Sequence, residues 1–349
     1  MVARHDYDQL AERGLRELLA VEHAIVWSEA QAKLADRCWE SLPVPVDPHH
    51  LTTARHQLIG QGVIEQSVSR TRGGRNIPIL VPADKQGRTR RIADASARKR
   101  LLQTRYVTWA SGSASTGAGV IGAAGEHVVH AALTVAAPYG YRLINPNSGQ
   151  VQSILGGPVP GGAVDNAAFL TTMDAQQLMP TGQYVVLVEV KNLREWIYPG
   201  AAELHQLLDK AARLQALHPE RALLPVLVCR RAHTITARMA EHLGFYVIST
   251  KRQYVPPSLA GPELDEVRAE LGYDLKPWPD VPPPAMVKHF STTLQGVAER
   301  TATRWRISAS QLGPYFAQLR DPRLHDRPEV TETLRQAAAG LLGVPRYAW

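Results

Sequence analysis

The chain of 349 residues carries 39 lysines and arginines against 32 aspartates and glutamates, and 44% of its residues are hydrophobic. That length and hydrophobic content allow two or three domains, each with its own core. The N-terminus is charged and no run of about eighteen apolar residues occurs, so we predict neither a signal peptide nor a membrane span, and we expect a cytoplasmic protein. Cys38 and Cys229 lie in apolar stretches and are predicted to be reduced core thiols.

The N-terminal part of the chain alternates helical patterns with proline breaks. Residues 7–41 repeat apolar side chains at helical spacing, and prolines at positions 43, 45 and 48 end that pattern. A helix over 47–60 follows, in which Asp47 is a plausible N-cap and Pro48 suits the first turn. Two β-runs, 63–69 and 77–81, then flank a Gly-Gly turn, which predicts a hairpin.

Helices followed by such a hairpin resemble a winged helix-turn-helix, a fold that binds double-stranded DNA. The resemblance implies that residues 49–60 form the recognition helix and that the hairpin turn is the wing tip; a wing used for protein contact is the alternative. The side chains expected at DNA are His50, Thr52, Thr53, Arg55 and His56 of the helix, Arg70, Arg72 and Arg75 of the wing, and Arg88, Arg90 and Arg91 of the connector that follows.

Positive charge is concentrated in one stretch of the sequence. Residues 70–105 hold eleven lysines and arginines against two aspartates, which is more than the excess of the whole chain. A local excess of this size indicates a polyanionic partner, although a solvated basic face gives the same pattern. The stretch ends in a predicted helix over 95–106.

The glycines between Gly117 and Gly122 match the dinucleotide-binding pattern literally. No strand precedes them and no acidic residue ends a second strand further on, so we interpret them as the lead-in to a helix over 123–137 and keep a nucleotide site as an alternative. Glu126 lies in that helix. His127 and His130 lie there too, but without the H-E-x-x-H order of a zinc protease, which favours exposed or packing histidines.

The apolar run at residues 184–192 predicts a buried strand that ends in Glu189, Val190 and Lys191. Side chains alternate across a strand, so Glu189 and Lys191 point to the same face. Charges at the exit of an apolar strand are costly to bury unless they pair or hold a ligand. A surface Glu and Lys on an edge strand is the simpler alternative. Upstream, Asp165 lies in a small, apolar stretch, and a turn at 179–182 would let its strand pair antiparallel and bring it beside Glu189.

Downstream, the sequence predicts a helix over 203–217 that carries Gln206, a strand over 223–229, a helix over 234–243 stopped by Gly244, and a strand over 245–249. The order from residue 95 to 255 is therefore helix, meander of strands, helix, strand, helix, strand.

This order, with Asp165 and Glu189-Val190-Lys191 placed as they are, resembles the PD-(D/E)xK nuclease superfamily of restriction and repair enzymes. The resemblance implies that Glu126 is the acid on the first helix, Asp165 the first metal-binding acid, Glu189 and Lys191 the signature pair, and Gln206 a glutamine that some branches carry on the next helix. The residue before Asp165 is Val164 where the family pattern has proline, so the letters match less well than the order of elements.

The resemblance implies metal-dependent hydrolysis of DNA. Mg²⁺ or Mn²⁺ would be bound by Asp165, Glu189, the Val190 carbonyl and Glu126, and Lys191 and Gln206 would complete the catalytic set. Three alternatives stay open: a DNA-binding regulator with an inactive nuclease fold, an RNA or tRNA nuclease, and a nucleotide-dependent enzyme that uses the Gly117 region. Restriction, phage defence, repair and mobile-element roles are equally open.

After residue 255 prolines become frequent, and helices are predicted over 263–271, 291–301, 308–319 and 330–342. A helical C-terminal subdomain of this kind could serve packing, homodimer formation or substrate clamping. We therefore expect an α/β (α+β) protein with three parts: a winged helix domain at 1–92, a restriction-endonuclease-like αβββαβ core at 93–255, and a proline-rich helical part at 256–349.

Overall fold

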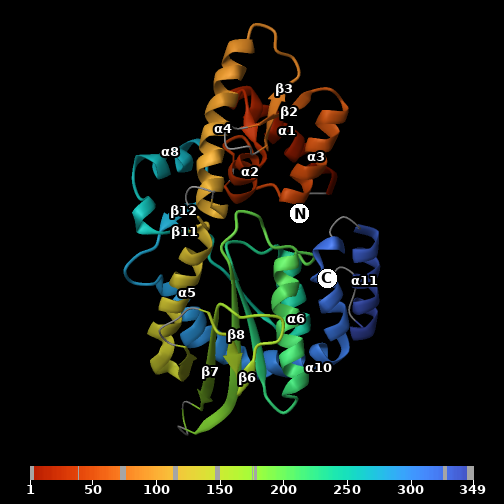
Figure 1. Cartoon of the computed structure of the whole chain (residues 1–349). Helices are drawn as coiled ribbons and strands as arrows, with labels where there is room; N and C mark the ends of the chain where they lie inside the picture. The colour runs from red at the N-terminus through yellow and green to blue at the C-terminus, as the bar shows by residue number, and fades with distance from the viewer. Residues whose placement is uncertain are drawn as a thin grey trace. The chain divides into compact units, whose positions relative to one another are not determined.

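The computed structural model describes residues 4–37, 39–70, 76–112, 117–145, 150–174, 176, 179–324 and 328–343. It is a mixed α/β protein that contains a five-stranded mixed sheet (Figure 1). The chain divides into two compact units. The first unit comprises Met1–Val120 and Pro257–Leu275, and the second comprises Ile121–Pro256 and Lys276–Trp349. The three-part division at residues 92 and 255 stays a prediction.

The first unit begins with helix α1 (Arg4–Glu22), strand β1 (Ile25–Val26), helix α2 (Trp27–Ala30) and the π-helix η1 (Gln31–Asp36). The helical pattern of residues 7–41, in which Ser28-Glu29 is a candidate start of a second helix, is interrupted: His23 adopts a positive φ of 61°, two residues of strand follow, and α2 begins at Trp27. Ile25 and Val26 are buried and pair antiparallel with Leu80 and Ile79. Pairing with a strand far along the chain therefore overrides the local helical periodicity.

Helix α3 (Pro48–Gly60) and the hairpin of β2 (Ile64–Arg70) and β3 (Asn76–Pro82) agree with the prediction. Asp47 caps α3, since its side chain accepts a hydrogen bond from the His49 amide at 2.8 Å. The sheet order is β1-β3-β2. The predicted wing-tip residues Arg72 and Arg75, and the side chain of Arg70, lie outside the described residues.

Helix α4 (Thr89–Ser111) is longer than the predicted 95–106 and packs against α8 (Pro262–Leu271). Lys99 on α4 is only 2% exposed, and its ammonium lies 2.6 Å from Glu29 and 2.7 Å from Glu22. Arg105 pairs with Glu266 of α8 at 2.6 Å. Part of the positive charge between residues 70 and 105 is therefore neutralised inside the unit, by acids from distant parts of the sequence.

The second unit is built on the five-stranded sheet, whose order is β10-β9-β8-β7-β4. Strands β4 (Tyr141–Ile144), β7 (Asn166–Met173) and β8 (Pro180–Lys191) form an antiparallel meander. Strands β9 (Leu223–Cys229) and β10 (Tyr246–Ser249) then add in parallel to β8. The predicted turn at 179–182 is instead the start of β8, because the β7–β8 hairpin pairs as far as Met173 and Pro180.

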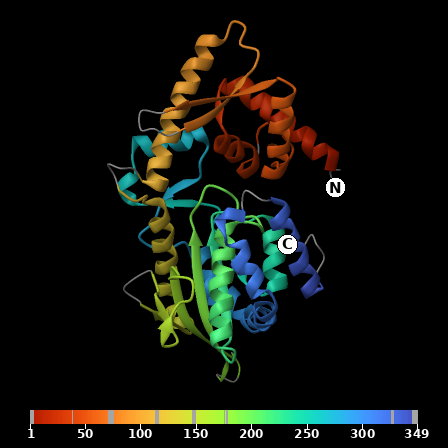
Figure 2. The ribbon, with the colours of Figure 1, turned by 45° about the vertical axis from the view of Figure 1, so that its right-hand side comes forward.

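Helices cover both faces of this sheet (Figures 1 and 2). One core joins a face of the sheet to α6 (Ala202–Leu217), α7 (Thr234–Leu243) and α10 (Gln295–Leu319). The other core joins the opposite face to α5 (Ile121–Ala136), α9 (Pro284–Lys288) and the π-helix η4 (His289–Leu294). Strand β9 is buried along its whole length, as expected for a central strand covered on both faces.

The two helices predicted over 291–301 and 308–319 are wrong as separate elements, because α10 continues through both and contains Pro314. Its buried side chains recur at helical spacing from Ala298 through Trp305 to Phe316, and they pack on α6. This helix therefore packs within the second unit. Helix α11 (Pro328–Leu342) packs on α10 in turn.

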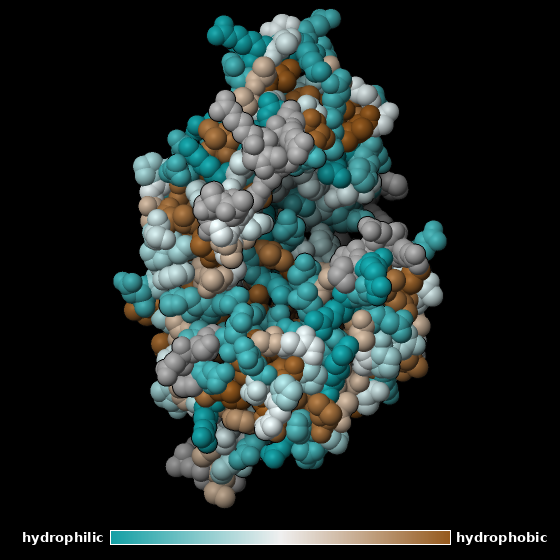
Figure 3. All heavy atoms as spheres, viewed as in Figure 1, coloured by the Kyte–Doolittle hydropathy of each residue, from teal (hydrophilic) through white to brown (hydrophobic). Residues whose placement is uncertain are grey.

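The remaining short elements are η2 (Ala137–Tyr139), β5 (Ser153–Ile154), β6 (Gly157–Pro158), β11 (Gln253–Val255), η3 (Pro257–Leu259), β12 (Leu275–Pro277) and η5 (Pro322–Leu324). Among the described residues, no helix has both the length and the apolar character that crossing a bilayer requires. The face drawn in Figure 3 carries its hydrophobic residues in small, separate patches between hydrophilic ones. Cys229 is a buried free thiol, and burial raises its pKa to about 12; Cys38 lies outside the described residues.

Candidate active site

Asp165 lies beside the end of β8. In the β7–β8 register Asn166 is opposite Val188, so Asp165, one residue before β7, continues that register to Glu189. The Asp165 carboxylate accepts a hydrogen bond from the Val190 amide, with 2.6 Å between Oδ2 and N. The N–H and C=O of one strand residue point to the same neighbour, so the Val190 carbonyl also points to the side of Asp165.

Glu189 and Lys191 share one face of β8, as the alternation predicts, and they form an ion pair. The Lys191 ammonium lies 2.9 Å from Glu189 Oε1 and 3.2 Å from Gln206 Oε1 of α6. Glu189 is 3% exposed. The interpretation of this pair as an exposed feature of an edge strand is wrong, because β8 is central in the sheet and Glu189 is buried.

A second lysine contacts Glu189, and the sequence analysis did not identify it. The Lys210 ammonium lies 3.0 Å from Glu189 Oε2, 3.3 Å from Oε1, and 2.6 Å from the carbonyl oxygen of Ala163. Lys210 follows Gln206 by one helical turn, so both side chains leave the same face of α6. This four-residue spacing is the sequence signal that could have identified Lys210, because a helix that directs Gln206 toward the site also directs Lys210 there.

Helix α5, which carries Glu126, approaches β8 closely. A Cβ atom added at Gly125 would lie 2.6 Å from the Cβ of Asn192, so only glycine permits this contact. The Asn192 amide donates to the carbonyls of Ile121 at 2.6 Å and Tyr254 at 2.7 Å, which fixes α5 against the end of β8. Burial raises the pKa of Glu126; Lys191 lowers it and Glu189 raises it further.

The same electrostatic field acts on Asp165. Burial raises the pKa of its carboxyl to about 7, and repulsion from Glu189 and Glu126 adds to the rise. The Val190 amide and Lys191 oppose it. The acids and the lysine singled out in the sequence therefore lie within electrostatic range of one another, at the ends of adjacent strands.

The loop before Asp165 is held by the C-terminal part of the second unit. Arg320, directly after α10, donates to Asp209 of α6 and to the carbonyl of Gly161, both at 2.9 Å. Gly161 has a φ of 81°, and Asp209 is fully buried. On the other side of Asp165, Asn166 Oδ1 lies 2.7 Å from His130 Nδ1 of α5. The position of Asp165 thus depends on α6 and α10 as well as on its own strand.

The oxygen atoms at this site suit a hard cation that is held by only a few protein ligands. Two carboxylates and one strand carbonyl supply the oxygen ligands that Mg²⁺ and Mn²⁺ bind, and Glu126 adds a third carboxylate to the field. Within the described parts of the chain, no group of three or more His, Cys, Asp or Glu is close enough to hold a metal ion by itself. Water and substrate oxygens would have to complete the coordination.

The predicted DNA-contacting face of α3 is partly engaged within the first unit. His50 Nδ1 lies 2.6 Å from Asp8, and the Arg55 guanidinium lies 4.5 Å above the Trp27 ring. Thr52 and Thr53 donate to backbone carbonyls one turn earlier in α3. His56 stays exposed.

The connector arginines lie near the start of α4. The Arg90 side chain is 95% exposed, 3.9 Å from Asp94, and Arg91 is exposed as well. Arg88 lies 3.8 Å from Asp84. Exposed pairs of this length contribute little to stability, so these arginines can exchange their partners for phosphates at small cost.

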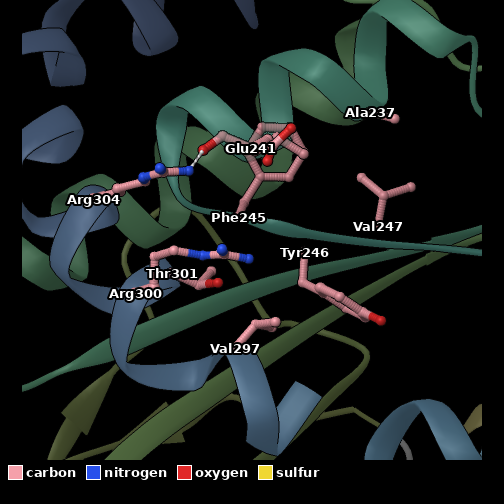
Figure 4. Close-up of a pocket in the computed structure, with 10 residues that line it drawn as sticks. Ala237, Glu241, Phe245, Tyr246, Val247, Val297, Arg300, Thr301 and Arg304 are labelled. Carbon is pink, nitrogen blue, oxygen red and sulfur yellow. Dashed lines mark hydrogen bonds between the residues drawn. The ribbon is translucent and has the colours of Figure 1, made fainter. Parts of the chain in front are cut away.

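The second unit also has a cavity of about 200 Å³ between α7, β10 and α10, away from the predicted site residues (Figure 4). Phe245 and Tyr246 line it together with Arg300 and Arg304, and Arg304 donates to the Glu241 carbonyl at 2.7 Å. None of the residues that line it was singled out in the sequence.

Comparisons of the chain with known protein families, with curated proteins and with solved structures found no match.

Proposed function

We propose that the chain is a metal-dependent endonuclease that hydrolyses phosphodiester bonds of duplex DNA, with a nuclease core of the PD-(D/E)xK type in the second unit. The proposal rests on one observation above all. Asp165 hydrogen-bonds to the backbone of Val190, between Glu189 and Lys191, so the two acids and the lysine meet at the ends of adjacent strands.

The topology of the second unit supports the same proposal. Helix α5, the β4-β7-β8 meander, α6, β9, α7 and β10 follow one another in the order that the resemblance implies. The antiparallel meander next to parallel strands supports the proposal of a restriction-endonuclease-like αβββαβ core. Asp165 and Glu189 lie at the edge of the sheet where strand β8 ends, beside helices α5 and α6.

The roles of the residues follow from their contacts. Asp165, Glu189 and the Val190 carbonyl would hold the cation, which supplies Lewis-acid polarisation of the scissile phosphate and a more acidic bound water. The Lys191 ammonium stabilises negative charge that builds up on the phosphate in the transition state. Gln206 accepts a hydrogen bond from Lys191 and so orients that ammonium. Glu126, further from the strands, would act through water.

The first unit supplies a candidate DNA-binding module. Helix α1, strand β1, helices α2 and α3 and the β2–β3 hairpin follow the order of a winged helix, and the exposed arginines of the connector adjoin it. Arg90 and Arg91 supply phosphate contacts that give affinity without sequence information. Together with the predicted wing arginines, they favour duplex DNA as the partner.

A DNA-binding regulator with an inactive nuclease fold is the second candidate, and one observation favours it. Glu189 is already paired with Lys191 and Lys210, as a purely structural ion cluster would be. A regulator of this kind would bind DNA through the first unit and leave it uncut.

Cleavage assays separate the two candidates. We expect the protein to cut plasmid and linear duplex DNA with Mg²⁺ or Mn²⁺ and to stop when EDTA is added. Lys191→Ala should lose about 10²-fold or more in single-turnover cleavage, whereas Lys288→Ala, which removes an exposed lysine of α9, should cleave as the wild type does. Identical cleavage by wild type and Lys191→Ala would end the enzyme proposal, and faster cutting of single-stranded RNA or tRNA would move it to RNA.

A further inference from the structure

The Lys210 ammonium lies in a shell of oxygen atoms. The Ala163 carbonyl lies 2.6 Å from it, and the two carboxylate oxygens of Glu189 lie at 3.0 and 3.3 Å. The side chain is 9% exposed, so these oxygens replace most of its hydration. A carbonyl and both oxygens of one carboxylate around a buried positive charge are also the ligands of a hard metal cation.

Lys210 is held firmly in this position. It leaves α6 one turn after Gln206, whose side chain contacts Lys191. Its neighbour Asp209 is fully buried and paired with Arg320 at 2.9 Å and with Arg213 at 2.7 Å. These two ion pairs hold that turn of α6, and the ammonium itself is held by the Ala163 carbonyl and the Glu189 carboxylate.

The cation proposed for the active site must share Glu189 with this lysine. On the side of Asp165, the carboxylate accepts from the Val190 amide, and the proposed divalent ion would bind there between Asp165 and Glu189. On the side of Ala163, the ammonium already fills the oxygen shell, and a second divalent ion there would be repelled by a positive charge at contact distance.

We propose that Lys210 occupies the place of a second metal ion, so that the active site binds a single divalent cation. This inference rests on the proposed function, because it concerns the metal content of that nuclease site. The Lys210 ammonium then stabilises the negative charge at Glu189 at all times, whereas a metal ion stabilises it only while it is bound. It is a positioning residue for Glu189, and Lys191 stays the lysine that faces substrate.

The metal content of the wild-type protein tests this without any substitution. In isothermal titration with Mn²⁺, we expect one strong site per chain, and the electron paramagnetic resonance spectrum should show isolated Mn²⁺ without an exchange-coupled pair. Two Mn²⁺ per chain with a coupled spectrum would overturn the inference and leave the nuclease proposal standing. Absence of Mn²⁺ binding together with absence of cleavage would overturn the nuclease proposal, and this inference with it.

A substitution tests the role of the ammonium directly. Lys210→Ala should lower cleavage by about 10²-fold with little change in KM, and small primary ammonium ions such as ethylammonium should restore part of it. Tetramethylammonium, which has no N–H donor, should not. Lys288→Ala is the control, since it removes a positive charge from an exposed position on α9 that has no part in the proposed site. Wild-type cleavage by Lys210→Ala, or equal rescue by both ammonium ions, would refute the proposed role.

Discussion

Asp165→Asn should stabilise the metal-free protein at neutral and alkaline pH while it abolishes metal-dependent cleavage. Asparagine keeps the oxygen that accepts from the Val190 amide and removes only the charge. An unfolded aspartate ionises near its ordinary pKa of 3.8, whereas the folded Asp165 has its pKa raised to about 7 by burial and by Glu189. The folded state therefore binds this proton more tightly, and stability is lost as the pH rises through that interval.

The expected gain in stability follows from the pKa shift of Asp165. One pKa unit corresponds to about 1.4 kcal/mol, so the rise from 3.8 to about 7 amounts to about 4 kcal/mol. Asp165 keeps some contact with solvent, and screening there reduces this to about 2 kcal/mol at pH 8. At pH 5 the pH has risen through only roughly a third of the interval between the unfolded and the folded pKa of Asp165. The gain in stability from asparagine should therefore be roughly a third as large.

Calorimetric unfolding in EDTA at pH 5, 6, 7 and 8 measures this difference. For a unit of this size about 2 kcal/mol corresponds to a rise in Tm of about 4–8 °C at pH 8. Asp280→Asn, at an exposed aspartate of the same unit, should give no pH-dependent gain. Saturating Mg²⁺ should raise the Tm of the wild type and leave that of Asp165→Asn unchanged. A variant that is less stable than the wild type at pH 8, or equally shifted at every pH, would refute the idea that a crowded carboxylate costs stability here.

Three further predictions concern the DNA-binding part, the helix that carries Glu126, and the buried charges of the first unit. The double variant Arg72→Ala/Arg75→Ala should weaken duplex binding and reduce its log–log salt slope by about 2; an unchanged slope in anisotropy titrations would remove the predicted wing from the interface. Gly125→Ala places a methyl group 2.6 Å from Asn192 Cβ, so it should cost about 1–3 kcal/mol in denaturant unfolding and slow cleavage; wild-type values for both would contradict the close approach. Lys99→Met removes one of the two lysines that contact Glu22 and Glu29, with Lys33 left as the other, and should cost about 3–5 kcal/mol; a loss below about 1 kcal/mol would show that Lys33 alone compensates the two glutamates.

The elements that carry the proposed site could be predicted where short-range signals are strong. The apolar runs of β8 and β9, and the Asp47 cap with Pro48 at the start of α3, gave these elements nearly at their observed positions. Antiparallel pairing of β7 with β8 then follows from the short connection between them. The proximity of Asp165 to Glu189 needed only that pairing, so the central pair of the candidate site was accessible from sequence.

Features that depend on contacts between residues far apart in the sequence could not be predicted from the sequence. Two β-branched residues at 25–26 are too few to override helical periodicity without β3, which lies more than fifty residues later. The predicted gap at 302–307 between two helices is closed in α10, which packs continuously on α6. The contact of Arg320 with Gly161 depends on how α10 docks on the sheet, which local periodicity does not fix.

A cluster of buried charge in each unit differs from the other in a way that bears on the proposed function. In the first unit, burial raises the pKa of Glu29, but every neighbouring charge that acts on it belongs to a lysine and opposes that rise. In the second unit, Asp165 and Glu126 each have a pKa raised by a neighbouring acid as well as by burial. A cluster that served only to hold the fold together would gain stability by losing one of those acids, because like charges that share a site repel each other. Asp165, Glu189 and Glu126 outnumber the two lysines that contact Glu189, and this surplus carboxylate supports the proposed cation site, because a bound cation would neutralise it.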